Sequence, residues 1–286
     1  MSNTHSLQVI SSVADFQLLK ASWEKSSSYS MGFVPTMGAL HEGHIKLVER
    51  AFSENDFVVV SIFVNPTQFN NPADLNLYPR TLENDLLLLS KVGPCVVFIP
   101  AVSTIYPKND SFQPINLHGL DSVMEGKFRP GHFQGVVHVV HNFFKLIQPN
   151  KAYFGKKDFQ QLAIIRFMND YFNFPIEIIA CETIREETGL AKSSRNMRLS
   201  DAEKKDALLI IETLKLIKKR RSLGLSPMES IEKGIAFFNQ GNLQLEYLEL
   251  VDSNSLLPLS KNWSTHTTCC IAAYCGSVRL IDNLEV

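Results

Sequence analysis

The segment from Asp56 to Val64, DFVVVSIFV, constrains the fold of this chain more than any other part of the sequence. It is almost wholly apolar and rich in β-branched residues, without the alternation that a half-exposed strand shows. A strand of this kind is buried on both faces, which is typical of a parallel sheet. The surrounding sequence must therefore supply further parallel strands and the helices that connect them.

Helical and strand-like segments alternate over the first 184 residues, as this arrangement requires. Helices are expected over 13–25, 81–92, 136–147 and 159–171, and strands over 95–99, 152–154 and 176–181. The alternation predicts an α/β fold, a doubly wound (Rossmann-like) parallel sheet in residues 1–184. Residues 65–80 and 119–135 are rich in Asn, Pro or Gly and are expected to be loops.

From residue 185 the pattern changes. A helix over 200–221, with Ser200 and Glu203 as a capping box, is followed by a helix over 227–239. Strand-like segments then follow over 245–251, 267–274 and 278–281. This order predicts a second, smaller α+β C-terminal domain over residues 185–286.

Composition excludes several classes of protein. The 28 Lys and Arg residues balance 29 Asp and Glu residues, whereas a nucleic-acid or membrane-surface binder would need a basic excess. No apolar run has the length of a membrane span, and the N-terminus lacks the features of a signal peptide. The five cysteines show no CxxC spacing and are expected to be reduced core thiols of a cytoplasmic protein.

A pair of histidines follows the strand-like segment from Met31 to Val34, which Pro35 and Gly38 are expected to end. The motif from His41 to His44, HEGH, places two imidazoles at or near the first turn of a helix that follows a strand. Backbone N–H groups and the helix dipole favour anions there, and imidazoles can stabilise charge that builds on a phosphate. The motif alone leaves open that the two histidines only cap and pack.

Three further polar loops carry groups that suit a polyphosphate or a hydroxy acid. They contain Gln68; Lys157, Asp158 and Gln161; and Lys192, Ser193, Ser194 and Arg195. The chain lacks G-x-G-x-x-G after a strand and G-x-x-x-x-G-K-[ST], which argues against a dinucleotide dehydrogenase and a P-loop NTPase. His138 and His141 have metal-like spacing, but without an evident third ligand they are interpreted as packing or dimer-contact residues.

Seven short segments occur in order along the chain: PTMGALHEGH, SIFVNPTQF, YPRTLENDL, RPGHFQGV, FGKKDFQQL, GLAKSSRN and RLIDN. Together they resemble the pantothenate synthetase (pantoate–β-alanine ligase) family, within the nucleotidylyltransferase superfamily whose HxGH and KMSKS-like motifs bind ATP. The resemblance implies an ATP-dependent condensation of pantoate with β-alanine to pantothenate, in the biosynthesis of coenzyme A. The reaction would pass through a pantoyl adenylate and release pyrophosphate and AMP.

The resemblance assigns roles residue by residue. His44 would be the catalytic histidine, and Gln68 and Gln161 would hold pantoate, with Gln68 also lining the β-alanine site. Asp85 is the candidate contact for a Mg²⁺ ion that accompanies ATP. ATP would be bound by Met37, Gly38, Ala39, Leu40, His41, Glu42, Gly43, His44, Gly155, Lys156, Lys157, Asp158, Ile184, Lys192, Ser193, Ser194 and Arg195.

Two positions depart from the family pattern. Lys156 stands where the family usually has Glu, and we expect a tuning effect there. Lys192 stands where the family usually has Met or Leu. Its cation would either strengthen ATP binding or point into solvent.

The resemblance also implies a homodimer formed through the N-terminal domain. Because the loop from Ser193 to Arg195 lies at the expected domain boundary, residues 185–286 are expected to act as a lid that excludes water from the acyl adenylate. Two alternatives remain open. One is a plain nucleotidylyltransferase that acts on another small acceptor, and the other is a non-catalytic nucleotide-binding module, against which the retained His41, His44, Lys157 and Arg195 argue.

Overall fold

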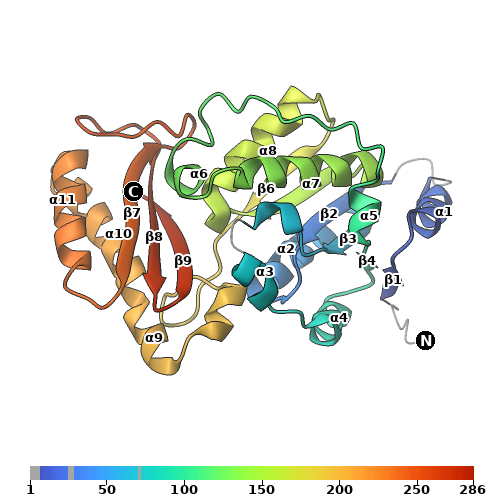
Figure 1. Ribbon diagram of the computed structural model, residues 1–286, viewed down its shortest axis with the longest axis horizontal. Coiled ribbons are helices and arrows are strands. Elements are labelled where there is room, and N and C mark those ends of the chain that lie inside the picture. Colours follow the sequence, from blue (N-terminus) through green and yellow to red (C-terminus); the bar gives the residue numbers. More distant parts are fainter. Residues whose placement is uncertain (1–6, 25–28, 70–71) are drawn as a thin grey trace. The chain divides into compact units, whose positions relative to one another are not determined.

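The computed structural model describes residues 7–24, 29–69 and 72–286, which form two compact units (Figure 1). Unit 1 comprises Met1–Leu117, Pro130–Lys156 and Ile164–Glu182, and unit 2 comprises His118–Arg129, Lys157–Ala163 and Thr183–Val286. Two short segments that precede residue 183 thus belong with the C-terminal part of the chain. The domain boundary expected between residues 184 and 185 stays a prediction.

Unit 1 is built on a six-stranded sheet in the order β1-β4-β3-β2-β5-β6, in which the described neighbours run parallel. The strands are β1 (Gln8–Ile10), β2 (Met31–Thr36), β3 (Phe57–Ile62), β4 (Val96–Phe98), β5 (Lys151–Gly155) and β6 (Glu177–Cys181). From β2 the chain moves outward to β3 and β4, and it then crosses to the other side of β2 with β5. The direction in which strands are added reverses between the paired strands β2 and β5, which is therefore the topological switch point. Doubly wound folds bind ligands there, beyond the carboxyl ends of the strands.

Helices and 3-10 helices connect these strands. Up to residue 182 the chain forms α1 (Val13–Trp23), α2 (Glu42–Glu54), η1 (Pro66–Gln68), α3 (Pro72–Leu77), α4 (Leu82–Ser90), α5 (Val102–Ile105), α6 (Met124–Phe128), α7 (His132–Ile147), η2 (Lys156–Asp158) and α8 (Phe159–Tyr171).

Both faces of the sheet are covered because successive strand residues point to opposite sides. On one face Val34 and Val60 pack in a cluster with Val48 of α2. On the other face Phe33 and Phe143 of α7 contact each other with ring centroids 5.5 Å apart. This two-sided burial explains why β3 is apolar except for Ser61, which is itself buried.

Unit 2 contains a three-stranded antiparallel sheet in the order β7-β8-β9 (red and orange in Figure 1). Its elements are η3 (Ser194–Arg198), α9 (Asp201–Asp206), α10 (Leu208–Ser222), α11 (Pro227–Phe238), β7 (Gln244–Asp252), β8 (Thr267–Cys275) and β9 (Val278–Glu285). Leu214 of α10 and Phe238 of α11 pack with Ile271 on one face, and Met124 of α6 packs with Cys270 on the other. The predicted fold class, a doubly wound parallel sheet with a smaller α+β C-terminal part, is confirmed.

Several local expectations were wrong. Pro35 lies inside β2 rather than ending it, because β5 pairs with β2 only at Gly32 and Phe33 and Pro35 lies beyond that pairing. The expected loop 65–80 contains η1 and α3, and Pro72 begins α3, where its missing N–H has no helical acceptor to lose.

The expected loop 119–135 contains α6 and the start of α7, which begins four residues earlier than expected, at His132. The helix expected over 200–221 is divided at Ala207 into α9 and α10, although its capping box of Ser200 and Glu203 is present. Residue 25, the last of the first expected helix, lies outside the described residues.

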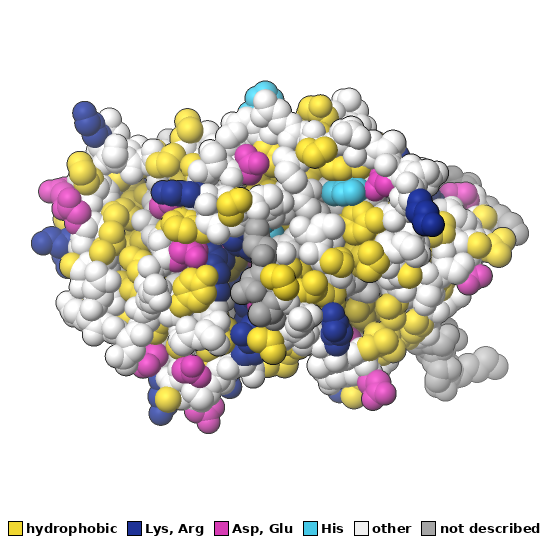
Figure 2. Space-filling model, viewed as in Figure 1, with side chains coloured by type: hydrophobic (Ala, Val, Ile, Leu, Met, Phe, Trp, Pro, Cys, Tyr) yellow, Lys and Arg dark blue, Asp and Glu magenta, His cyan; other side chains and the backbone are white. Residues whose placement is uncertain are grey.

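Three general properties bear on the classes of protein considered. Acidic and basic side chains are intermingled on the visible face (Figure 2), in line with the balanced composition. In the described ranges, no helix combines the length and apolarity needed to cross a membrane. All five cysteines are buried and none forms a disulfide.

Candidate functional site

The histidine pair lies where the chain leaves β2 at the switch point. His41 is the N-cap of α2, and its Nδ1 accepts the Gly43 N–H at 3.1 Å, while Nδ1 of His44 accepts the His41 N–H at 3.3 Å. The ring centroids lie 4.1 Å apart. Because Nδ1 accepts in both rings, a neutral ring carries its proton on Nε2, which makes Nε2 the donor that a phosphate oxygen requires. The pair does cap the helix, and capping orients it for an anion.

The turn before the histidines is held by a buried carboxylate. Gly38 and Ala39 have φ angles of +78° and +49°. Asp85, which is 1% exposed, accepts the N–H groups of Ala39 and Leu40 at 2.9 and 2.8 Å. The Thr81 hydroxyl also donates to Asp85, at 3.0 Å.

The Mg²⁺ contact expected at Asp85 does not fit this geometry. One carboxylate oxygen receives two donors and the other receives one, and the side chain is buried. Mg²⁺ needs ligand oxygens about 2.0–2.1 Å away in an open octahedral arrangement that retains waters. Within the described residues, no group of three or more His, Cys, Asp or Glu side chains is placed to hold a metal.

Gln68 lies on η1, beside the same turn. Its side-chain amide nitrogen lies 2.6 Å from the Met37 sulfur, and its amide oxygen accepts from Asn65 at 3.2 Å. Asn65 is 1% exposed and also accepts from the Tyr106 hydroxyl at 2.6 Å. The structure therefore brings Gln68 and Met37 together. It also places Asn65 beside Gln68, a residue that the sequence analysis did not assign to the site. Its position in the SIFVNPTQF segment could have indicated this.

Gly155 and Lys156 lie at the carboxyl end of β5, on the other side of the switch point from His41. Lys156 forms an ion pair with Glu182, which follows β6. The cation that departs from the family pattern thus has a carboxylate partner of its own. Its expected tuning effect stays a prediction.

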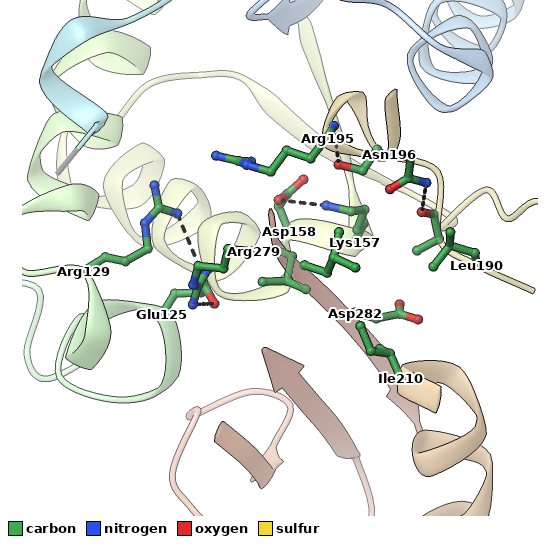
Figure 3. Close-up of a pocket in the computed structure, with 14 residues that line it drawn as sticks. Glu125, Arg129, Lys157, Asp158, Leu190, Arg195, Asn196, Ile210, Arg279 and Asp282 are labelled. Carbon is green, nitrogen blue, oxygen red and sulfur yellow. Dashed lines mark hydrogen bonds and ion pairs between the residues drawn. The ribbon is translucent and has the colours of Figure 1, made fainter. Parts of the chain in front are cut away.

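A pocket within unit 2 collects other predicted residues (Figure 3). It is lined by Glu125, Arg129, Lys157, Asp158, Leu190, Ala191, Ser193, Arg195, Asn196, Ile210, Arg279, Leu280, Ile281 and Asp282. The predicted ATP contacts Lys157, Asp158, Ser193 and Arg195 are among them. Ile184, Lys192, Ser194 and Gln161 belong to the same unit but do not line this pocket, and Lys192 donates its backbone N–H to Ile184 at 2.9 Å.

Arg129 is a pocket residue that the sequence reasoning did not assign to ATP, although it lies in the RPGHF segment. In Figure 3 its guanidinium and that of Arg195 extend toward one another from different segments. Burial lowers the pKa of Arg129, the Glu125 carboxylate opposes this shift, and the positive charge of Arg195 adds to it. Two guanidinium groups that extend toward one another can bind an anionic ligand between them.

Glu125 anchors this part of the pocket. It receives two hydrogen bonds from Arg279, at 2.7 and 2.8 Å, and one each from Tyr247 at 2.8 Å and Arg129 at 3.4 Å. Burial alone would raise its pKa, but Arg279 and Arg129 lower the pKa of Glu125 to about 2. Arg279 is also paired with Glu246. The carboxylate is therefore ionised and fixed.

The C-terminal RLIDN segment, on β9, supports the rest of the pocket. Asp282 forms two hydrogen bonds with Arg185, at 2.6 and 3.0 Å. Asn283 donates from its side chain to the Lys157 carbonyl at 2.8 Å. One strand thus ties down the start of the 185–195 loop and the backbone that carries Lys157.

His138 and His141 make packing and polar contacts rather than a metal-like arrangement. His138 lies 2.5 Å from Asp110 through Nε2 and stacks on Phe112, with centroids 4.2 Å apart. His141 is buried and packs against Phe172.

A doubly wound sheet with a histidine pair at its switch point, together with a small unit that carries a cationic pocket, defines a nucleotide-binding α/β enzyme. The family model of pantoate-beta-alanine ligases matches residues 8–285. The chain belongs to the pantoate–β-alanine ligase family and is a ligase.

Relatives and solved structures agree with this assignment. The pantothenate synthetase of Bacteroides fragilis is 45% identical over 98% of this chain and 99% of its own, and that of Cytophaga hutchinsonii is 48% identical over 92% and 94%. The structure of the Thermus thermophilus pantothenate synthetase has a TM-score of 0.90 and 40% identity, covering 98% of this chain and 99% of that one.

A ligase from Francisella tularensis, complexed with Beta-gamma ATP and β-alanine, has a TM-score of 0.83 and 35% identity, and the match covers 98% of each chain. The alternatives of a plain nucleotidylyltransferase and a non-catalytic module are not favoured.

Proposed function

We propose that this chain condenses pantoate with β-alanine in an ATP-dependent reaction that passes through a pantoyl adenylate. Family membership and the likeness to the Francisella tularensis ligase support the proposal. The observation in this structure that carries it is the histidine pair at the carboxyl end of β2, with both rings fixed through Nδ1.

In the first step a pantoate carboxylate oxygen attacks the α-phosphorus of ATP. The new O–P bond forms as the bond to the β-phosphate oxygen breaks, and pyrophosphate leaves with that electron pair. Such a step needs alignment and charge neutralisation more than a strong base. We assign His44 as the catalytic histidine, which donates from Nε2 to the reacting phosphates, and His41 as its neighbour on the same nucleotide.

In the second step the amine of β-alanine attacks the acyl carbon of the adenylate. The C–N bond forms, the bond from that carbon to the phosphate oxygen breaks, AMP leaves, and the nitrogen gives up a proton. We assign pantoate to Gln68 and Gln161, with Gln68 also lining the β-alanine site. The contact of Gln68 with Met37 and Asn65 supports a preformed position for its amide.

The ATP contacts that we propose follow the family resemblance. They are Met37 to His44, Gly155 to Asp158, Ile184, Lys192 to Arg195 and, added from the pocket, Arg129. Mg²⁺ is proposed to enter with the phosphates of ATP, since Asp85 does not fit as its ligand. Residues 185–286 are proposed as a lid, which scattering with and without an ATP analogue would test.

We further propose a homodimer and a cytoplasmic location. The family resemblance supports the homodimer, and analytical ultracentrifugation would test it. The five buried, unpaired cysteines support a reducing compartment.

One assay tests the reaction itself. The chain is incubated with ATP, pantoate and β-alanine, and AMP and pantothenate are measured, with omission of each substrate in turn. We expect AMP release to require pantoate, and pantothenate to require β-alanine. Formation of a stable nucleotide conjugate, or no turnover, would contradict the proposal.

A further inference from the structure

We propose that Asp85 is a positioning residue whose carboxylate holds the turn from Gly38 to Leu40, and so sets the place of the histidine pair. This inference rests on the proposed function, because it assigns Asp85 a part in that site. It replaces the metal contact expected from the sequence with a role that the hydrogen bonds around Asp85 support.

The turn is unfavourable without a partner. Ala39 has a φ angle of +49°, in the left-handed region that L-residues other than Asn and Asp rarely adopt. Together with Gly38, this conformation aims consecutive N–H groups to one side, which is the geometry of an anion-binding nest. The Asp85 carboxylate is the anion, 2.9 Å from the Ala39 nitrogen and 2.8 Å from that of Leu40.

Asp85 is also held by contacts that do not involve the turn from Gly38 to Leu40. It lies in the first turn of α4, where its backbone N–H donates to the Thr81 carbonyl at 2.9 Å and its side chain accepts the Thr81 hydroxyl at 3.0 Å. A Cβ at position 38 would lie 3.1 Å from the Asp85 carboxylate. Gly38 and Asp85 are thus fitted to each other, and the absence of a side chain at Gly38 lets the carboxylate reach the turn.

The turn held by Asp85 is joined directly to the histidine pair. Leu40, which donates to Asp85, directly precedes His41, the N-cap of α2. If the turn relaxes, the N-cap and the first turn of α2 lose their fixed entry, and the two imidazoles move off the reacting phosphates. A small misplacement of this kind lowers the rate of the chemical step more than it weakens binding.

The test compares Asp85→Asn with Glu83→Gln, which removes a carboxylate from the same helical turn at an exposed position. An asparagine amide keeps the size of Asp85 but has one acceptor oxygen, whereas Ala39 and Leu40 donate to different oxygens of Asp85. Three quantities are measured: amide exchange over residues 37–44, the single-turnover rate of pyrophosphate release, and Mn²⁺ binding by electron paramagnetic resonance with a non-hydrolysable ATP analogue present.

For Asp85→Asn we expect faster amide exchange over 37–44, a pyrophosphate rate lower by about 10²-fold, and Mn²⁺ affinity within about twofold of the parent chain. Glu83→Gln should match the parent in all three. A tenfold or greater loss of Mn²⁺ affinity, with the rate restored by excess metal, would show a metal ligand and overturn the inference.

Should Asp85→Asn fail to fold, Thr81→Val removes one donor to the carboxylate while keeping its charge. Faster exchange over 37–44 supports the inference, and unchanged exchange together with an unchanged rate overturns it. The exchange measurement needs no substrate. Failure of the proposed function, seen as no pantothenate from the parent chain, is therefore distinguishable from failure of this inference.

Discussion

Glu125 shows how one buried carboxylate organises a cationic pocket at the scale of single residues. Its bonds to Arg279 are shorter than its bond to Arg129, at 2.7 and 2.8 Å against 3.4 Å. Arg279 therefore holds the carboxylate more closely than Arg129 does. Removing one partner of such a buried pair leaves the other charge uncompensated.

Glu125→Gln should destabilise unit 2 at neutral pH by an amount on the order of 3 kcal/mol. The folded-state pKa of Glu125, about 2, lies below the ordinary glutamate pKa of 4.5. Its contribution is therefore present above about pH 4.5 and is lost as the pH falls toward 2. Urea unfolding is measured at pH 7, 5 and 3. The difference in free energy of unfolding between the variant and the parent chain should decrease only below pH 5, and a difference that is the same at all three pH values would contradict this. Glu232→Gln, an exposed change in unit 2, serves as the control.

His44→Ala tests whether this histidine acts on the adenylation transition state. We expect the rate of adenylate formation to fall by about 10²–10³-fold, because one donor to the developing charge is lost. Pantoate binding, measured by calorimetry, should change by no more than about twofold. His44→Asn, which keeps a short acceptor for the His41 N–H, separates the loss of the cap from the loss of the imidazole. His266→Ala, at an exposed position, is the control. Equal losses of rate and of pantoate binding would point to a structural role.

Among the elements, α7 and η1 show how a helix positions a substrate loop. Gly135 of α7 lies so close to η1 that a Cβ there would sit 2.5 Å from the Thr67 carbonyl oxygen. His132 contacts the Gln68 carbonyl at 2.8 Å, and Asn65 donates to the Gly135 carbonyl at 3.2 Å. The start of α7 therefore fixes the 3-10 helix that carries Gln68.

Gly135→Ala should displace η1 and lower kcat/KM for pantoate by up to about 10²-fold. The stability of the rest of unit 1 should change little, because the added methyl group meets η1 rather than the sheet core. Steady-state kinetics with pantoate as the varied substrate checks this. Lys145→Ala, at an exposed position of the same helix, should leave kcat/KM unchanged. An unaltered kcat/KM in Gly135→Ala would show that η1 is not held from α7.

The elements that the sequence predicted are those whose signal is local. The apolar run of β3, the capping box of Ser200 and the helical segment of α8 can each be recognised within one stretch of sequence. In contrast, β1 has three residues, of which only Ile10 is buried, and its place depends on pairing with β4. Such an element has no periodicity to read.

The residues of the candidate site likewise fall into those that a local sequence motif identified and those that it did not. The HxGH motif and the Lys-Ser-Ser-Arg loop were found as sequence segments. The roles of Asp85 and Glu125 were missed because their partners are distant in sequence, 46 positions away for Ala39 and 154 for Arg279. A local sequence pattern does not indicate which N–H group will donate to a given carboxylate. The burial of Asp85 depends on how α4 packs, which the sequence alone does not show.

At the scale of the molecule, the two units have separate apolar cores. Leu89 belongs to a cluster in unit 1 and Leu214 to a cluster in unit 2, and both side chains are fully buried. Chains with two cores commonly depart from two-state unfolding.

Leu89→Ala and Leu214→Ala form a matched pair for this property. Each should cost about 2–5 kcal/mol through lost burial and a residual cavity. In differential scanning calorimetry each substitution should lower the midpoint of a different transition. A single transition lowered equally by both would mean that the two cores unfold together.

The buried cysteines have a practical consequence for studying motion in this enzyme. Burial raises the pKa of the Cys95 thiol to about 12 and raises those of Cys181 and Cys275. At neutral pH these sulfurs hold little thiolate, the form that reacts with maleimides and oxidants. A fluorophore can therefore be attached at one introduced surface cysteine on each unit without first replacing the native five. Energy transfer between two such dyes would follow the motion of the proposed lid during turnover, because the native cysteines would remain unlabelled.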